Sequence, residues 1–259
     1  MDSNALTKTL FDAFPFEPTG AQKQALHAMA SFFDDESDEA VFILKGYAGT
    51  GKTTLIGALV KSITKLHYKT VLMAPTGRAA KVMAAYANRA ACTIHKRIYY
   101  TQQERQGNLK FKLQKNKFKR TLFLVDEASM IANQQQQSKL FENGSLLQDL
   151  IEYVSSGEDC KLMFVGDTAQ LPPVHTSLSP ALDSNVLSID YNLSPHEVEL
   201  DEVVRQGKDS GILFNATRIR QQLLNNQTER FQFILAKFPA TGLSFFVLGR
   251  CISSNIILL

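Results

Sequence analysis

A glycine-rich segment directly after an apolar run constrains this chain more than any other feature. Residues 46–54 read Gly-Tyr-Ala-Gly-Thr-Gly-Lys-Thr-Thr and follow the run Val41–Leu44. The pattern G-x-x-x-x-G-K-[ST] is typical of a phosphate-binding loop between a buried strand and a helix, which we expect over Thr53–Leu66. Glycines let consecutive backbone N–H groups turn inward around phosphate oxygens, and the start of the helix adds positive potential. The segment therefore predicts a site for a nucleoside triphosphate.

This loop also supplies the predicted contacts to the nucleotide. Lys52 is expected to reach the β- and γ-phosphates, and the hydroxyl of Thr53 is expected to bind Mg²⁺. ATP and Mg²⁺ are thus the expected cofactors. The residues that the loop would place around the phosphates are Gly46, Ala48, Gly49, Thr50, Gly51, Lys52, Thr53 and Thr54.

Composition narrows the class of protein. The chain has 259 residues, 44% of them hydrophobic, which suffices for the core of one large α/β domain. Its net charge of +3 is too small to indicate a nucleic-acid partner by itself. Cys92, Cys160 and Cys251 form neither a disulfide framework nor a metal-binding spacing. The N-terminus lacks a secretory pattern, and the most apolar stretch, Leu243–Leu259, is interrupted by polar residues. We therefore expect a soluble cytoplasmic protein with no membrane partner.

Strands and helices are predicted to alternate along the chain. Short apolar runs typical of buried parallel strands occur at Val41–Leu44, Val71–Ala74, Leu122–Val125 and Leu162–Val165. Helical patterns lie between them at Thr53–Leu66, Gly77–Ala87 and Ser145–Val154. This alternation predicts an α/β fold, a doubly wound parallel sheet that binds its ligands at the carboxyl ends of the strands.

Three polar segments interrupt the alternation. Asp34–Glu39 is predicted to be a solvated acidic turn, and Asn133–Gln137, which contains four consecutive glutamines, is predicted to be a loop. Tyr99–Arg120 is an insertion with Gly107-Asn108 near its centre and alternating residues after it. That pattern predicts an inserted β-hairpin.

Acidic and amide side chains follow two of the predicted strands. Asp126 and Glu127 come directly after Leu122–Val125, where Asp126 could hold Mg²⁺ and Glu127 could orient or deprotonate an attacking water. Gln170 lies in the segment Gly166–Val174, which follows Leu162–Val165 and could place its amide beside the γ-phosphate. The alternatives are a pair of exposed acids at a strand end and a tight turn stiffened by two prolines.

Taken in this order, the segments at residues 46–54, 126–129 and 166–174 resemble those of superfamily 1 DNA helicases of the RecD/Dda-like branch. The resemblance covers roughly residues 15–220. It implies a RecA-like P-loop NTPase domain that hydrolyses ATP and binds single-stranded DNA or a DNA fork. It also implies a second motor domain, for which we find no matching motifs. The movement of related helicases from 5′ to 3′ is implied by the resemblance alone.

The resemblance assigns further roles residue by residue. Contacts to single-stranded DNA are implied for Pro75, Thr76, Arg78, Thr93 and His95. It also implies that Arg205 reaches the γ-phosphate and that Gln22 contacts adenine. Each has a structural alternative: His95 as a packed residue, Arg205 as a surface ion pair after an acidic helix, and Gln22 as part of an exposed helix.

The predicted hairpin carries most of the charge asymmetry. Its basic residues, with no acid among them, are Arg105, Lys110, Lys112, Lys115, Lys117, Lys119 and Arg120. Phe111 and Phe118 are interleaved with them, and basic side chains beside aromatic rings suit a nucleic acid whose bases can stack. Related helicases have a strand-separating pin between the same two motifs, so we interpret the hairpin, with Lys110 and Lys112, as its counterpart. The alternative is a solvated edge hairpin protected by lysines.

These observations predict a domain organisation and leave the function open between three classes. A RecA-like ATPase domain is expected over residues 1–98 and 121–226, a pin-like hairpin over 99–120, and an atypical apolar tail over 227–259. The tail indicates a truncated or frame-shifted start of a second domain, or a surface for a protein partner. The chain could be an ATP-dependent helicase motor, an ATP- and DNA-binding module that does not unwind, or another P-loop ATPase such as a small-molecule kinase.

Overall fold

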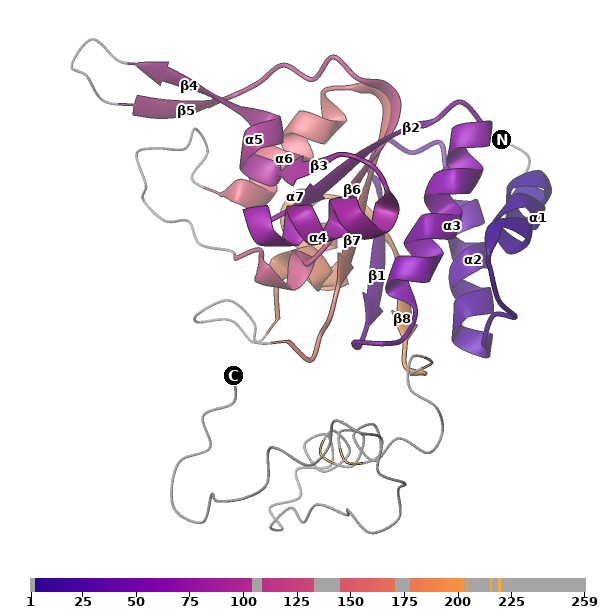
Figure 1. The fold of residues 1–259 in the computed structure, drawn as a ribbon. Helices are drawn as coiled ribbons and strands as arrows, with labels where there is room; N and C mark the ends of the chain where they lie inside the picture. Colours follow the sequence, from indigo (N-terminus) through magenta and orange to yellow (C-terminus); the bar gives the residue numbers. More distant parts are fainter. Residues whose placement is uncertain are drawn as a thin grey trace, which may run out of the picture. The chain divides into compact units, whose positions relative to one another are not determined.

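A sheet of six parallel strands organises the part of the chain that the computed structural model describes, which comprises residues 3–103, 109–132, 145–170, 178–202, 204, 215 and 219. The strand order is β3-β2-β6-β7-β1-β8, and every neighbouring pair is parallel (Figure 1). The strands are β1 (Ala40–Gly46), β2 (Lys69–Ala74), β3 (Ala91–Thr93), β6 (Lys119–Val125), β7 (Glu158–Gly166) and β8 (Ser194–Leu200). All carboxyl ends therefore lie at one edge of the sheet.

Helices cover both faces of this sheet (Figure 1). One face packs against α1 (Ser3–Ala13), α2 (Gly20–Asp34), α3 (Lys52–Lys65) and α4 (Gly77–Ala87). The other packs against α5 (Ile94–Ile98), α6 (Leu146–Ser155), α7 (Ser184–Tyr191) and the short turns η1 (Ala128–Met130) and η2 (Pro180–Leu182). This arrangement confirms the predicted doubly wound α/β fold. None of the helices in the described ranges is long and apolar enough to cross a membrane.

Alternate residues of the central strands enter two separate hydrophobic cores. In β1, Phe42 and Leu44 pack on the side of α1–α3, whereas Val41 and Ile43 pack on the side of α5–α7. Every residue of β1 is buried. A parallel strand that is covered on both faces needs apolar side chains on both, which is why continuous apolar runs marked these strands in the sequence.

The two edge strands, β3 and β8, were not predicted from the sequence. The interpretation of the acidic segment before Arg205 as a helix is wrong, because Glu197 and Glu199 lie on β8. Glu197 there accepts a hydrogen bond of 2.5 Å from Lys45 Nζ on β1. An edge strand is paired on one side only and is less completely covered, so its sequence can be polar. Arg205 itself lies outside the described residues.

The predicted inserted hairpin is present and firmly attached at its base. It consists of β4 (Tyr99–Gln103) and β5 (Leu109–Leu113), paired antiparallel and projecting from the sheet domain (Figure 1). The Tyr99 hydroxyl donates to buried Asp149 on α6 over 2.5 Å, and Gln114 Nε2 donates to Tyr99 O over 2.6 Å. Gly107-Asn108 and Arg105 lie outside the described residues, as does Asn133–Gln137. β6 already begins at Lys119, so the last two residues assigned to the insertion belong to the central sheet.

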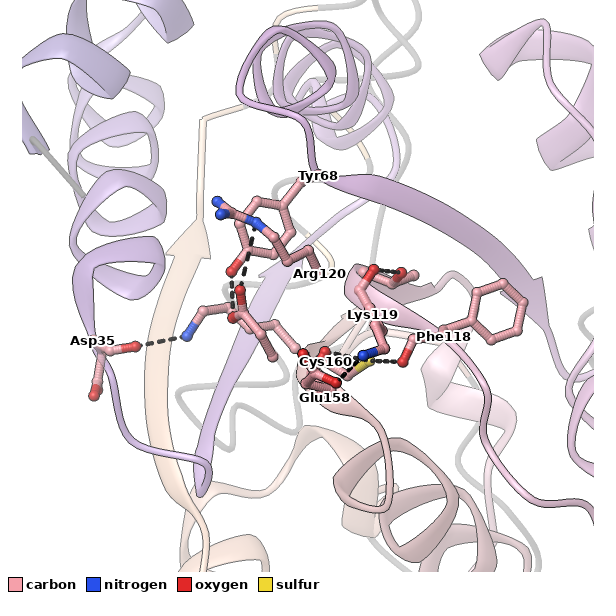
Figure 2. A network of polar contacts seen from close by, with 10 residues as sticks. Asp35, Tyr68, Phe118, Lys119, Arg120, Glu158 and Cys160 are labelled. Atoms are coloured by element: carbon pink, nitrogen blue, oxygen red, sulfur yellow. Dashed lines mark hydrogen bonds and ion pairs between the residues drawn. The ribbon is translucent and has the colours of Figure 1, made fainter.

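A polar network ties the amino ends of the central strands to the loop after α2 (Figure 2). Tyr68 donates to Asp159 Oδ1 over 2.5 Å, and Lys161 Nζ donates to Asp35 O over 2.6 Å. The Asp35 carboxylate lies 2.8 Å from His196 Nε2, a hydrogen bond that lowers the pKa of Asp35. The prediction that Asp34–Glu39 is merely a solvated turn is therefore wrong at its start, since Asp34 belongs to α2 and Asp35 joins this network.

Candidate active site

The segment that joins β1 to α3 has the backbone of a phosphate-binding loop. Gly49 and Gly51 have φ angles of 85° and 95°, in the left-handed region that glycine adopts without strain. A Cβ on Gly46 would lie 2.8 Å from Thr50 Oγ1 and 2.9 Å from Leu200 Cβ, so the end of β1 has no room for a side chain. Ala48 is exposed on the loop, and Thr54 is partly buried in the first turn of α3. The loop thus presents backbone N–H groups at the start of a helix.

Lys52, the first residue of α3, hydrogen-bonds back to the first residues of the same loop. Its Nζ donates to Gly46 O over 2.5 Å and to Tyr47 O over 2.9 Å. Burial lowers the pKa of the Lys52 ammonium, and the charges of Asp167, Asp126 and Glu127 oppose that shift. A cation is therefore held where the carboxyl ends of β1, β6 and β7 meet.

The acid pair follows β6, with each carboxylate held differently. Asp126 Oδ1 accepts from Glu127 N over 2.9 Å, and Asp126 Oδ2 accepts from the Tyr86 hydroxyl of α4 over 2.6 Å. Burial and the neighbouring Asp126 charge raise the pKa of that Tyr86 hydroxyl, so it remains a donor. Glu127 has a left-handed backbone, with φ of 56° and ψ of 36°, which is uncommon for a residue other than glycine and frequent at functional sites.

The surroundings of Glu127 shift the pKa of its carboxyl in the direction that suits a proton acceptor. Burial, together with the charge of Asp126, raises the pKa of its carboxyl, whereas a hydrogen bond with Gln170 and the charge of Lys52 lower it. An acid whose pKa is shifted toward neutrality accepts a proton more readily than an ordinary surface glutamate. The acid pair predicted from the sequence therefore lies in one site with Lys52 and Gln170.

Gln170 joins two strands of the site. It lies just after β7, which pairs with β6, and its Oε1 accepts from Ser129 Oγ over 3.0 Å. Its side chain also hydrogen-bonds that of Glu127, so one amide contacts two residues of the segment after β6, Glu127 and Ser129. The preceding Asp167 is buried, and its Oδ1 accepts from Ala169 N over 2.8 Å. Leu171–Val174, the remainder of the predicted motif, lies outside the described residues.

Gln22 supports the phosphate loop from α2. Its Nε2 donates to Thr50 O over 2.9 Å, and its Oε1 accepts from Thr19 N over 3.1 Å in a capping box at the start of α2. Gln22 is only 4% exposed, so the expectation that it lies on an exposed helix surface is wrong. The predicted contact of Gln22 with adenine stays a prediction.

The oxygen donors near the loop fit Mg²⁺. Thr53 is exposed in the first turn of α3, and Asp126 lies at the end of β6. In the described part of the chain no group of three or more His, Cys, Asp or Glu side chains gathers as a metal-binding cluster. Mg²⁺ prefers oxygen ligands and commonly binds through one or two protein groups, with waters and substrate phosphates completing its shell. Thr53 and Asp126 are thus suitable ligands for a magnesium ion that is bound together with a nucleotide.

Comparison with known proteins identifies the family. Residues 18–233 match the family described as AAA domain, which is most of the chain. The chain belongs to this AAA domain family. The matched range includes the phosphate loop, the acid pair and the polar residue after β7, which lie together at one edge of the parallel sheet.

Relatives of the AAA domain confirm the resemblance to RecD-like helicases. The chain is 31% identical over 161 residues to the ATP-dependent RecD2 DNA helicase of Deinococcus radiodurans, covering 62% of this chain and 20% of that protein. It is 28% identical over 195 residues to the uncharacterized protein R530 of Acanthamoeba polyphaga mimivirus, covering 67% of this chain and 36% of that one. This chain therefore spans between a fifth and somewhat more than a third of the length of these relatives.

A solved structure is also similar. The Pif1 helicase from Bacteroides, crystallised with ADP-AlF3 and single-stranded DNA, matches with a TM-score of 0.45 and 21% identity, over 78% of this chain and 46% of that one.

The AAA domain also brings two of the segments expected to contact DNA to neighbouring strand ends. Ala74 of β2 pairs with Thr93 of β3, so the turns after both strands lie side by side. Thr76 caps α4 by accepting from Ala79 N over 3.2 Å, and Thr93 caps α5 by accepting from Lys96 N over 3.2 Å. Pro75 is half-buried in the turn after β2, and Arg78 is exposed in the first turn of α4. The placement suits contacts to a phosphate backbone, which stay a prediction.

His95 and the hairpin phenylalanines have structural partners in the AAA domain. The His95 ring lies 5.9 Å from that of Tyr99, and burial lowers the pKa of its imidazole. Phe111 packs 6.1 Å from Tyr99, whereas Phe118 packs 5.5 Å from Phe123. Both phenylalanines are partly buried and pack against the hydrophobic core on the α5–α7 side. Their stacking on bases stays a prediction.

The register of the hairpin offers a different aromatic residue. Tyr100 pairs with Lys112, and Gln102 pairs with Lys110, so these four positions share one face of the two-stranded ribbon. Tyr100 is 48% exposed and Lys112 is half-buried, whereas nothing is described for the side chain of Lys110. The sequence analysis missed Tyr100 because Tyr99-Tyr100 precedes the basic run instead of alternating with it.

Other site residues that the sequence analysis missed are Tyr86, Ser129 and Asp167. Ser129 and Asp167 are part of the motifs at residues 126–129 and 166–174, so their proximity to the site could have been foreseen. Tyr86 gave no signal, because 40 residues separate it from Asp126 and a tyrosine within an amphipathic helix normally indicates packing.

Gly51 at the N-cap of α3 and Gly57 inside the helix allow a matched test of the loop geometry. Gly51→Ala should lower the free energy of unfolding by about 1–2 kcal/mol, because a Cβ is strained at this positive φ. That Cβ would also lie 2.4 Å from Gln22 Nε2, so nucleotide affinity should fall as well. Gly57→Ala is the control, since nothing lies within 4 Å and alanine should stabilise the helix by about 0.5–1 kcal/mol. Urea unfolding of both variants measures the difference, and equal stabilities would contradict the assigned loop geometry.

Proposed function

We propose that this chain is an ATP-hydrolysing motor domain of a DNA helicase or translocase that binds single-stranded DNA. The observation that supports it most directly is the contact of Gln170 with both Glu127 and Ser129, beside the Lys52 ammonium. A group in that position can respond to the presence of the γ-phosphate while it orients the residue that activates water. The relationship to the RecD2 helicase gives the reaction class.

Each residue has a role in hydrolysis. The loop N–H groups and Lys52 bind the phosphate oxygens, while Glu127 accepts a proton from the attacking water. The water oxygen bonds to the γ-phosphorus as the bond to the bridging oxygen breaks, and ADP leaves with that electron pair. Mg²⁺ held by Thr53 and Asp126 would supply positive charge at the β- and γ-phosphates. Arg205 is proposed to stabilise the negative charge that develops on the transferred phosphoryl group.

The DNA strand is proposed to lie along the neighbouring turns and the hairpin. Thr76, Arg78 and Thr93 would contact backbone phosphates, since helix starts and guanidinium groups suit such contacts. On the hairpin, Lys110 and Lys112 would contact phosphates while Tyr100 offers a ring on which a base can stack. Pro75 and His95 would shape the turns between these contacts, and Gln22 would adjoin the adenine.

Turnover of ATP with and without a single-stranded oligonucleotide tests the function on the purified chain. We expect stimulation by the oligonucleotide. Turnover that single-stranded DNA leaves unchanged would instead indicate another kind of P-loop ATPase. A forked-duplex assay then separates an active helicase from a module that binds ATP and DNA without unwinding.

Removing charge from the hairpin should weaken DNA binding in a salt-dependent way. In the Lys110→Ala/Lys112→Ala variant, the slope of log K against log salt should be shallower by up to about 1.4, because each single-strand phosphate contact contributes about 0.7. Lys23→Ala/Lys61→Ala, which removes two exposed lysines from α2 and α3, is the control and should leave the slope unchanged. Fluorescence anisotropy over a salt series measures both, and an unaltered slope in the hairpin variant would mean that the hairpin is only solvated.

A further inference from the structure

Asp126 is bonded at two points to the segment that contains β2, the Thr76 turn and α4. Its backbone N donates to Met73 O over 2.9 Å, three residues before Thr76. Its Oδ2 accepts from the Tyr86 hydroxyl over 2.6 Å, ten residues after Thr76. The proposed ligand of the metal and the proposed DNA-contacting turn therefore belong to one closed set of contacts.

We propose that Tyr86 is a positioning residue that couples the nucleotide site at Asp126 to the DNA-contacting turn at the start of α4. The inference rests on the proposed function, and it adds the contact through which the two sites influence each other. Tyr86 touches neither nucleotide nor DNA in this proposal. It acts through Asp126 at one end and through the helix that begins at Gly77 at the other.

The strength of the Tyr86 contact depends on the charge of Asp126. A hydroxyl that donates to a free carboxylate makes a charge-assisted hydrogen bond, which weakens when a cation neutralises that carboxylate. The bond therefore differs between the empty and the loaded nucleotide site. A contact that differs between two states is what coupling between sites requires, and the effect must be reciprocal.

The rest of α4 is placed to transmit such a change. Met83 is fully buried and Ala80 is 5% exposed, so one side of the helix is fixed in the core next to α3. On the other side Arg78, Lys81 and Val82 are exposed. The first turn is capped by Thr76. In this proposal, a change in how the last turn is held shifts the position at which Thr76 and Arg78 meet a phosphate.

A Tyr86→Phe substitution isolates the hydroxyl, because the ring keeps its packing against the core. Tyr68→Phe is the matched control: it removes another tyrosine hydroxyl that donates to an aspartate, at the opposite edge of the sheet (Figure 2). The readout is the affinity of the full chain for a fluorescent oligothymidylate without nucleotide and with a nonhydrolysable ATP analogue and Mg²⁺. Melting temperatures establish that each variant is folded.

The expected results distinguish this inference from the proposed function. The affinity ratio between the two states should be about fivefold or more in the wild-type chain and in Tyr68→Phe, and within about twofold in Tyr86→Phe. In Tyr86→Phe the Mg²⁺ concentration that half-saturates analogue binding should also fall, because the competing donor is gone. An unchanged ratio or an unchanged Mg²⁺ midpoint in Tyr86→Phe overturns this inference alone. A wild-type chain that binds neither oligonucleotide nor ATP overturns the proposed function and this inference together.

Discussion

Lys52→Ala is expected to reduce kcat for ATP hydrolysis by about 10²–10³-fold, the usual cost of losing one group that stabilises charge in the transition state. The charges of Asp167, Asp126 and Glu127 all act on the Lys52 ammonium. Its Nζ also holds the loop through Gly46 O and Tyr47 O, so nucleotide binding should weaken as well. Steady-state phosphate release and titration with a fluorescent ATP analogue measure the two effects.

Lys61→Ala is the control for this substitution. Lys61 is exposed on the same helix, so its loss should leave kcat within about twofold. DNA-stimulated hydrolysis that persists in Lys52→Ala would show that the phosphate site has been wrongly assigned.

Glu127→Gln is expected to reduce kcat by about 10²–10⁴-fold and to leave analogue affinity nearly unchanged. The amide keeps the shape of the side chain and can still contact Gln170, but it cannot take a proton from water. Glu36→Gln, which alters an exposed acid in the loop after α2, should have no effect. A Glu127→Gln chain with wild-type turnover would remove Glu127 from the proposed chemistry.

The pH dependence of the wild-type chain follows from the same residue. The pKa of Glu127 is raised above its ordinary value of 4.5, first by burial. Because the deprotonated form is the active one, kcat should fall as the pH drops toward and through this raised pKa. The loss should begin at a higher pH than for an ordinary glutamate, and Glu127→Gln should abolish this limb of the profile.

The central fold could be predicted because its strands are buried on both faces. Val41–Leu44 and Leu162–Val165 are apolar at every position, a pattern that periodic analysis detects directly. β8 could not be recognised in this way. It is an edge strand in which Glu197 and Glu199 are tolerated, because Glu197 is paired with Lys45 and Glu199 is exposed. Local sequence does not reveal which strands have a neighbour on one side only.

The candidate site was predictable where it followed a strand. Lys52, Asp126 and Gln170 each lie in the segment that follows an apolar run, and parallel strands bring such segments to one edge. Contacts between distant segments could not be predicted, because they leave no pattern in the sequence. Gln22 is buried against Thr50, and Tyr86 reaches Asp126, through tertiary packing that no spacing encodes. Phe111 and Phe118 show the opposite difficulty, since aromatic rings between lysines occur both in nucleic-acid surfaces and in the base of a packed hairpin.

The attachment of the hairpin has a mechanical consequence. Tyr99, its first residue, is hydrogen-bonded to Asp149 of α6, and Gln114, the residue after β5, returns to Tyr99 O and Ile98 O. Both strands of the hairpin are therefore hydrogen-bonded at their base, which restricts rotation of the hairpin about that point. A force that acts on β4 and β5 would therefore be passed to α6 and the central sheet through these hydrogen bonds.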